Sequence, residues 1–219
     1  MTSSLVVQTS FIGDVILTTP LIAKLAEAGD VDVVTTPVGA TVLANNPAIR
    51  RVIVYDKRGG DRDVAGLVGA GLQAHQRAGV VPGFVPKVGG RGWGEVWHNI
   101  SQLERSAATH ERGLWDELPP TPDRRAYLAQ GSIRSAVLAM VAGCRERVGF
   151  ETSSGRVLYT RRVTYREDWH HARRLLSLAG ETDGVVRPRV YPGGADVAAV
   201  DLLLGGRTRP FMALAPGSV

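Results

Sequence analysis

Leu5-Val-Val-Gln-Thr-Ser-Phe-Ile-Gly-Asp14 runs directly into Val15-Ile-Leu-Thr-Thr-Pro20-Leu-Ile-Ala-Lys-Leu-Ala-Glu-Ala-Gly29, and this stretch decides the fold. The short apolar run at its start is typical of a buried strand in a parallel sheet. Polar turn residues follow, and apolar residues then recur at helical spacing until Gly29. The stretch therefore predicts a strand, a tight loop and a helix. In an open α/β sheet, ligands bind beyond the carboxyl ends of the strands, so we expect Ser10, Gly13 and Asp14 at a binding site.

Asp14 has two interpretations. An acidic residue at the start of a helix is commonly an N-cap, which accepts backbone N–H bonds and contributes about 1 kcal/mol. Alternatively, the carboxylate faces a cleft and acts as a general base. The local sequence leaves both open.

The same alternation of strands and helices continues along the chain. Strands are predicted over 31–36 and 51–56 with a short helix over 38–43 between them, and order resumes with a strand over 125–130. This spacing indicates an α/β fold with a doubly wound parallel sheet. Between these parts, the glycine-broken stretch 59–122 is irregular, and we expect it to be disordered or an aberrant insert because long structureless loops are uncommon in compact domains.

A second strand, turn and helix follows that stretch. Ser132 is expected to cap a helix over 133–142 that ends at Gly143, and the strand 147–150 comes next. Gln130, Ser132 and Arg134 should then share one sheet edge with Asp14. Arg134 lies in the first turn, where a cation opposes the helix dipole. This placement favours an anion-binding role, but an ordinary solvated arginine stays an open alternative.

The composition limits the function classes. The chain of 219 residues carries a net charge of +5, and its pI is near 9.8. Arginine suits phosphate and carboxylate partners; no zinc-finger spacing or basic sheet motif is present, so we expect no nucleic-acid partner. The single Cys144, expected as a buried thiol in an apolar helix, excludes an internal disulfide. Without a membrane-spanning or signal segment, the chain is expected in the cytoplasm.

Other polar motifs have ordinary interpretations. Adjacent histidines in a helix over 167–179, His170 and His171, point in different directions and do not form a metal site. The Asp-x-Asp strings at 30–32 and 61–63 are interpreted as turns, and the glycines at 89–94 make a poor dinucleotide loop. We therefore expect no metal and no cofactor.

The last part of the chain is expected to begin a second unit. An extended linker is predicted over 188–192, a helix over 195–204, and a new buried strand over 210–219 with a Pro-Gly-Ser turn. The expected division is a Rossmann-like domain over 1–190 and the start of a second domain over 191–219. The chain would then be truncated at the start of that second domain.

Four pieces of the sequence resemble glycosyltransferase family 9, the lipopolysaccharide heptosyltransferases. The first, Ser10-Phe-Ile-Gly-Asp-Val-Ile-Leu-Thr-Thr-Pro-Leu, is similar to the family's N-terminal signature. Three more agree in order: Tyr127-Leu-Ala-Gln-Gly-Ser-Ile-Arg-Ser-Ala-Val-Leu-Ala, then Arg147-Val-Gly-Phe with Leu158-Tyr-Thr-Arg-Arg-Val, then Ala213-Leu-Ala-Pro-Gly-Ser-Val.

The resemblance implies a GT-B architecture, in which the first domain holds a lipid-linked acceptor and the second holds the ADP-heptose donor. It implies metal-independent, inverting transfer to the lipopolysaccharide inner core at the inner face of the inner membrane, with Asp14 as general base. It places Ser10, Gly13, Gln130, Ser132 and Arg134 at the acceptor, and Pro216, Gly217 and Ser218 at the donor phosphates. Because the donor domain is missing beyond its first strand, this chain alone is expected to be inactive or nearly so.

Two other classes of protein compete with this interpretation. A nucleotide-dependent oxidoreductase needs a glycine fingerprint after the first strand and an acidic residue ending the second, and the sequence supplies neither. A non-catalytic carbohydrate- or nucleotide-binding domain shares every feature of the enzyme fragment. Only an effect of replacing Asp14 on sugar transfer would separate them.

Overall fold

The computed structural model describes residues 2–56, 124–180 and 187–205. They form, in chain order, β1 (Thr2–Gln8), α1 (Ile12–Leu17), α2 (Thr19–Ala26), β2 (Gly29–Thr35), α3 (Pro37–Leu43), β3 (Arg51–Val54), β4 (Arg124–Leu128), α6 (Ile133–Val141), β5 (Glu146–Phe150), the 3₁₀ helix η1 (Ser154–Leu158), β6 (Arg161–Val163), α7 (His171–Leu176), the 3₁₀ helix η2 (Ser177–Ala179) and α8 (Gly194–Leu204). The predictions for 59–122, including the second Asp-x-Asp string, and for the strand over 210–219 lie outside these residues.

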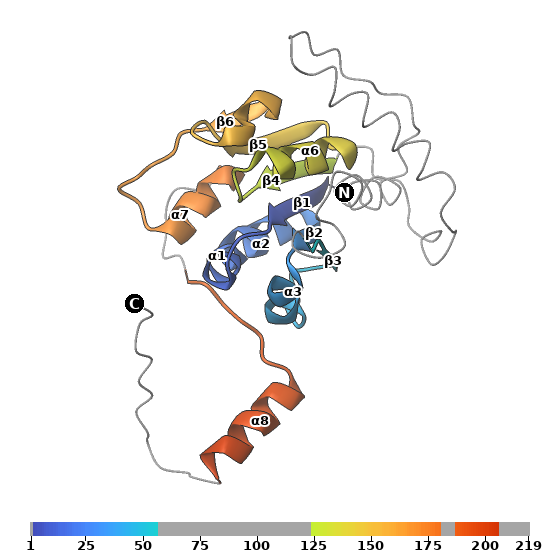
Figure 1. The fold of residues 1–219 in the computed structure, drawn as a ribbon, viewed down its shortest axis with the longest axis vertical. Coiled ribbons are helices and arrows are strands. Elements are labelled where there is room, and N and C mark those ends of the chain that lie inside the picture. The colour runs from blue at the N-terminus through green and yellow to red at the C-terminus, as the bar shows by residue number, and fades with distance from the viewer. Residues whose placement is uncertain (1, 57–123, 181–186, 206–219) are drawn as a thin grey trace, which may run out of the picture.

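The described strands form one six-stranded sheet in the order β3-β2-β1-β4-β5-β6 (Figure 1). Every neighbouring pair is parallel. The order runs outward from β1 in one direction and from β4 in the other, which is the doubly wound arrangement, so the predicted fold class is confirmed. The direction reverses between β1 and β4, and this switch point is where open α/β sheets bind ligands.

Helices cover both faces of the sheet because successive strand residues point to opposite sides. Val6 and its neighbours on one face pack under α1, α2, α3 and α7, in a cluster with Val15, Leu21, Ile22, Val33, Leu43, Leu175 and Leu178. Leu5 and Val7 on the other face pack under α6 and η1, in a cluster with Val34, Ala136, Leu138, Ala139 and Leu158. The continuous apolar run at Leu5–Val7 is thus explained by burial on both sides of β1.

The predicted first helix is two helices, α1 and α2, which meet at Thr18. Pro20 has no N–H to donate to the carbonyl of Ile16, so a continuous helix would leave that carbonyl without its usual partner. The Thr19 hydroxyl donates to it instead, at 2.7 Å. The helical pattern in the sequence was correct, but the proline divides it.

The first Asp-x-Asp string lies in a strand, and its Asp32 forms a buried ion pair, so the interpretation of the string as a turn was wrong. Asp30 and Asp32 belong to β2. Fully buried Asp32 contacts the Arg124 guanidinium, itself almost fully buried, and Arg50 Nη2 at 2.7 Å, while Arg50 Nη1 reaches Asp30 at 2.6 Å. The hydrogen bond to Asp32 raises the pKa of Arg50. These four residues, the amino-end ion network, join β2, the residue before β3, and β4.

Two further expectations need correction. The predicted helix over 167–179 begins only at His171 and tightens into η2 before it ends at Gly180, whose φ of +86° suits glycine. Cys144 lies after α6, beyond Gly143, instead of within the helix. Its thiol is buried as expected, and burial raises its pKa to about 12, so it stays protonated and unreactive at neutral pH.

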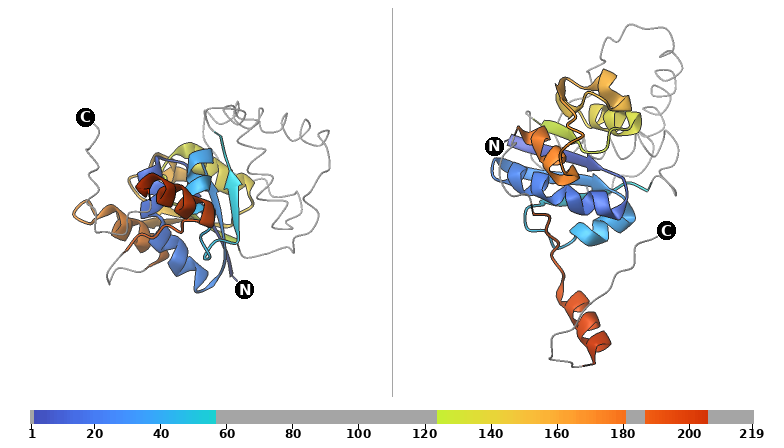
Figure 2. Two further views of the ribbon diagram at one scale, coloured as in Figure 1. Left: turned by 90° about the horizontal axis from the view of Figure 1, so that it is seen from below. Right: turned by 90° about the vertical axis from the view of Figure 1, so that its left-hand side faces the viewer.

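The predicted helix over 195–204 is observed as α8, which projects from the sheet at the end of an extended segment (Figures 1 and 2). None of its residues is buried, and even the apolar side chains of Leu202 and Leu203 are 83% and 85% exposed. Among the described residues, the helices are too short or too polar for any of them to traverse a bilayer.

Candidate active site at the carboxyl edge of the sheet

The loops that follow β1 and β4 meet at the switch point of the sheet. The Gln130 backbone N–H donates to the Val7 carbonyl at 3.2 Å. The Thr9 hydroxyl donates to Gln130 Oε1. The expected proximity of the two strand–loop–helix units is therefore observed, because β1 and β4 are parallel neighbours whose carboxyl ends lie at one edge.

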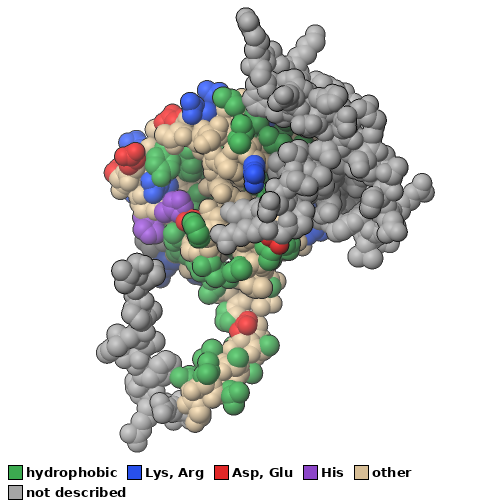
Figure 3. All heavy atoms as spheres, in the orientation of Figure 1, with side chains coloured by type: hydrophobic (Ala, Val, Ile, Leu, Met, Phe, Trp, Pro, Cys, Tyr) green, Lys and Arg blue, Asp and Glu red, His purple; other side chains and the backbone are tan. Residues whose placement is uncertain are grey.

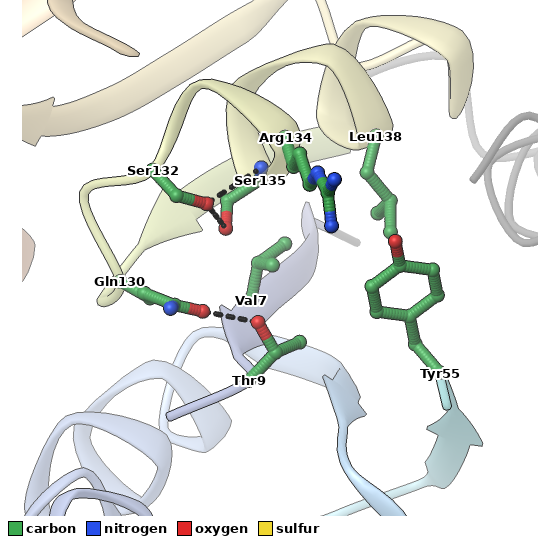
Figure 4. A pocket seen from close by; sticks show the side chains of 8 residues that line it. All are labelled: Val7, Thr9, Tyr55, Gln130, Ser132, Arg134, Ser135 and Leu138. Carbon is green, nitrogen blue, oxygen red and sulfur yellow. Dashed lines mark hydrogen bonds between the residues drawn. The ribbon is translucent and has the colours of Figure 1, made fainter. Parts of the chain in front are cut away.

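A pocket of about 210 Å³ opens between these loops, on the sheet face that α6 covers (Figure 4). Its lining combines apolar side chains of the sheet and helix with polar groups from the two loops: Val7, Thr9, Tyr55, Gln130, Ser132, Arg134, Ser135 and Leu138. Three of the five residues predicted for the acceptor, namely Gln130, Ser132 and Arg134, are among them. A small number of polar groups in an apolar concavity is typical of small-molecule sites.

The first turn of α6 presents a hydroxyl and a cation to this pocket. Ser132 is the N-cap of α6 as predicted, and its oxygen accepts from the Ser135 N–H at 3.2 Å. The exposed Arg134 extends from the same turn toward the space between Val7 and Tyr55 (Figure 4). The fold gains nothing from a cation there, since it opposes the helix dipole. An anion in the pocket would meet the guanidinium and the amino end of α6 together.

Asp14 is not the cap of its helix. The N-cap of α1 is Phe11, which makes no side-chain cap hydrogen bond, and Asp14 is the third residue of the helix. The N-cap interpretation was therefore wrong. The Asp14 side chain is 36% exposed, and its Oδ1 lies 3.7 Å from His171 Nε2 at the start of α7. The carboxylate is thus open to solvent on one side and faces an imidazole on the other.

His171 has an altered acid–base character. Partial burial lowers its pKa below the usual imidazole value of 6.5. Asp14 opposes that shift by favouring the imidazolium, whereas Arg174 and His170 reinforce it. The lowered pKa favours the neutral imidazole at pH 7.

The other two residues predicted for the acceptor, Ser10 and Gly13, lie near Asp14 in sequence but outside the described lining of the pocket. The Ser10 N–H donates to Gln8 Oε1 at 3.3 Å. A Cβ at Gly13 would meet nothing within 4 Å, so the backbone of α1 is openly accessible there. The predicted donor residues Pro216, Gly217 and Ser218 lie outside the described residues.

Thr9, Tyr55 and His171 are among the residues of this edge that were absent from the predicted site. Thr9 and Tyr55 directly follow β1 and β3, so their polar atoms at the ends of parallel strands could have indicated them. His171 had no such signal, because only the packing of α7 against α1 brings it to Asp14. Figure 3 shows the described histidine side chains at the molecular surface.

The part of the chain that the structure describes contains no candidate metal-binding site. No group of three or more His, Cys, Asp or Glu side chains there is arranged to hold a metal ion. Asp14 and His171 are two such side chains without a third, and Asp30 and Asp32 face arginines.

Comparison with known proteins finds likeness only in structure: no family model and no curated protein matches the sequence. A glycosyl transferase of family 9 from Veillonella parvula matches 95% of this chain and 50% of its own, with a TM-score of 0.62 and 16% identity. The ADP-heptose lipopolysaccharide heptosyltransferase II of E. coli matches 92% of this chain and 50% of its own, with a TM-score of 0.55 and 17% identity.

A third structure agrees with these two. The E. coli heptosyltransferase WaaC, solved with ADP, matches 92% of this chain and 53% of its own, with a TM-score of 0.51 and 19% identity. The chain spans about half the length of each of these three proteins. The resemblance noted in the sequence is confirmed for the fold: this chain has the doubly wound α/β fold found in about half of a family 9 glycosyltransferase.

Proposed function

We propose that the chain is the acceptor-binding part of an inverting, heptosyltransferase-like glycosyltransferase, with Asp14 as the general base. The observation that carries the proposal is the placement of Asp14: a partly exposed carboxylate at the carboxyl edge of this fold that caps no helix. An inverting transfer needs one base to remove the proton of the attacking hydroxyl, and such a base contributes about 10²–10⁴-fold.

The acceptor in this proposal is an acidic sugar of the lipopolysaccharide core. Arg134 and the amino end of α6 supply positive charge in the pocket, and Gln130, Ser132 and Thr9 supply neutral hydrogen-bonding groups. Ser10 and Gly13 would border the sugar nearer Asp14. The net charge of +5 agrees with an anionic acceptor and with peripheral contact with the inner membrane surface.

The donor is a nucleotide sugar, and ADP-heptose is the specific candidate. WaaC, which shares the fold, was solved with ADP. In the proposed division, residues 1–190 bind the acceptor and 191–219 begin a donor-binding domain in which Pro216, Gly217 and Ser218 approach the phosphates. Positioning both substrates supplies about 7–11 kcal/mol of catalysis, so transfer in this proposal requires the donor-binding part as well as the acceptor pocket.

Sugar transfer tests the role of Asp14. In a version that carries a complete second domain, with ADP-heptose and truncated lipopolysaccharide, Asp14→Asn should lower kcat by about 10²–10⁴-fold. An unchanged rate would remove Asp14 from the reaction. It would leave the alternative, a non-catalytic carbohydrate- or nucleotide-binding domain, as the better description.

Acceptor binding can be measured on the chain itself by calorimetry with a core oligosaccharide. Arg134→Gln should weaken binding by roughly 10- to 100-fold, because a hydrogen bond to a charged group contributes about 1.5–3 kcal/mol. Arg145→Gln is the matched control, since that exposed arginine follows the other end of α6, away from the pocket. Equal affinities for the two variants would contradict an acceptor site in this pocket.

A further inference from the structure

His171 lies close to Asp14 although the two residues are far apart in the sequence. Oδ1 and Nε2 are 3.7 Å apart, and the two side chains are 36% and 31% exposed. This separation exceeds a hydrogen bond by several tenths of an ångström, as is common for catalytic pairs without bound substrate. Both groups therefore reach solvent and can also reach one another after a small side-chain movement.

The position of His171 is set by packing. Ala172, Leu175 and Leu176 bury α7 in the layer that also contains α1 and α2. The preceding His170 caps the helix, and its Nδ1 accepts from the Ala172 N–H at 3.4 Å. The first residue of α7 is thus directed at the third residue of α1, while its neighbour His170 serves the backbone.

We propose that His171 is a positioning residue for Asp14, receiving through that carboxylate the proton of the attacking hydroxyl and passing it to solvent. This inference rests on the proposed function, because it takes Asp14 to be the base. An imidazole is in general a stronger base than a carboxylate, so a proton on Asp14 moves readily to a neutral His171.

The charged groups around the imidazole suit such a proton acceptor. Among the described residues, Asp14 on α1 stabilises an imidazolium, whereas Arg174 on α7 and the cap residue His170 oppose it. The charge on α2, Lys24, is paired with Glu27 at 2.9 Å. Burial also disfavours the charged form, which favours a neutral imidazole able to accept a proton.

The proposed step balances in protons and bonds. The acceptor O–H bond breaks as its oxygen forms a bond to the anomeric carbon, and the bond from that carbon to the diphosphate breaks. The nucleoside diphosphate leaves with the electron pair of that bond. The proton passes to Asp14, then to Nε2 of the neutral imidazole of His171, and the resulting imidazolium gives up a proton to water.

Nuclear magnetic resonance titration of the full chain tests the coupling without any activity. Asp14→Asn should lower the pKa of His171 further, because it removes the group that favours the imidazolium. His170→Gln is a control of opposite sign and should raise it. In the wild type, the Asp14 ¹³Cγ signal should also respond over the pH range in which His171 titrates, and His171→Gln should abolish that response. A His171 pKa that is the same with and without the Asp14 carboxylate would overturn the inference.

A pH profile of transfer in the two-domain version separates this inference from the proposed function. Wild-type kcat should fall as the pH drops through the pKa of His171, and His171→Gln should lower kcat, keep KM and lose that inflection. If Asp14→Asn abolishes transfer but His171→Gln leaves the profile unchanged, only this inference fails. If Asp14→Asn has no effect on transfer, the proposed function fails and this inference fails with it.

Discussion

The two ends of the sheet carry the same kinds of charged side chain in opposite circumstances. At the amino end, Asp32 and Arg124 are buried and paired, and Arg50 joins them. At the carboxyl edge, Asp14 is partly exposed with a loosely placed imidazole beside it, and Arg134 is exposed in a helix turn that disfavours a cation. Charges that serve the fold satisfy one another, whereas charges at the candidate site are left accessible.

The strongest test of this contrast is Asp32→Asn. Removal of one partner from a buried ion pair should lower the free energy of unfolding by about 3–5 kcal/mol, because the Arg124 charge stays buried without its counterion. Chemical denaturation measures the change. Asp30→Asn, whose side chain is 52% exposed, is the control and should cost no more than about 1 kcal/mol. Similar losses for both variants would break the comparison.

Ser132 lies between the two extremes because it serves both the fold and the pocket. Ser132→Ala should lower the free energy of unfolding by about 1 kcal/mol through loss of the α6 cap. Ser132→Asn should keep the stability, since asparagine is also a good cap. A thermal or urea unfolding series on these two variants gives the answer, and an unaffected Ser132→Ala protein would mean that the cap is not needed.

The His171 imidazole should give stability a small pH dependence. Its pKa is lower in the folded chain than the ordinary 6.5, so the unfolded chain binds more protons in this range and stability rises with pH there. The contribution of His171 is complete above the unfolded pKa of 6.5 and is lost as the pH falls from there through the lower folded pKa. When unfolding is measured from about pH 5 to 7, the free energy of unfolding of the wild type should rise relative to that of His171→Gln as the pH increases. A constant difference would contradict this sign.

Arg134→Gln should have the smallest effect on stability, and in the unusual direction. Because a cation in the first turn opposes the helix dipole, its removal should leave the chain unchanged or more stable by a few tenths of a kcal/mol. Denaturation curves of Arg134→Gln and of the control Arg145→Gln, recorded under the same conditions, measure the change in the free energy of unfolding. A clear loss of stability would place Arg134 with the structural charges of the amino end.

Local patterns predicted the elements well because the interactions that define them are local. Ser132 caps α6, as the sequence indicated. The errors occurred where a neighbour decided the outcome. Pro20 divided a regular helical pattern, and Asp32, which lies in the predicted strand and was also assigned to a turn, forms a buried ion pair with Arg124, 92 positions away.

Sequence alone determined the class of fold, the carboxyl edge as the place for a site, and the candidates Asp14, Gln130, Ser132 and Arg134. Periodicity, caps and turn residues are short-range features, and the parallel topology follows from their alternation. Only the tertiary structure decided that Gln130, Ser132 and Arg134 share a pocket and that Asp14 faces His171. Such contacts depend on strand order and on how α7 packs against α1, which no local pattern encodes.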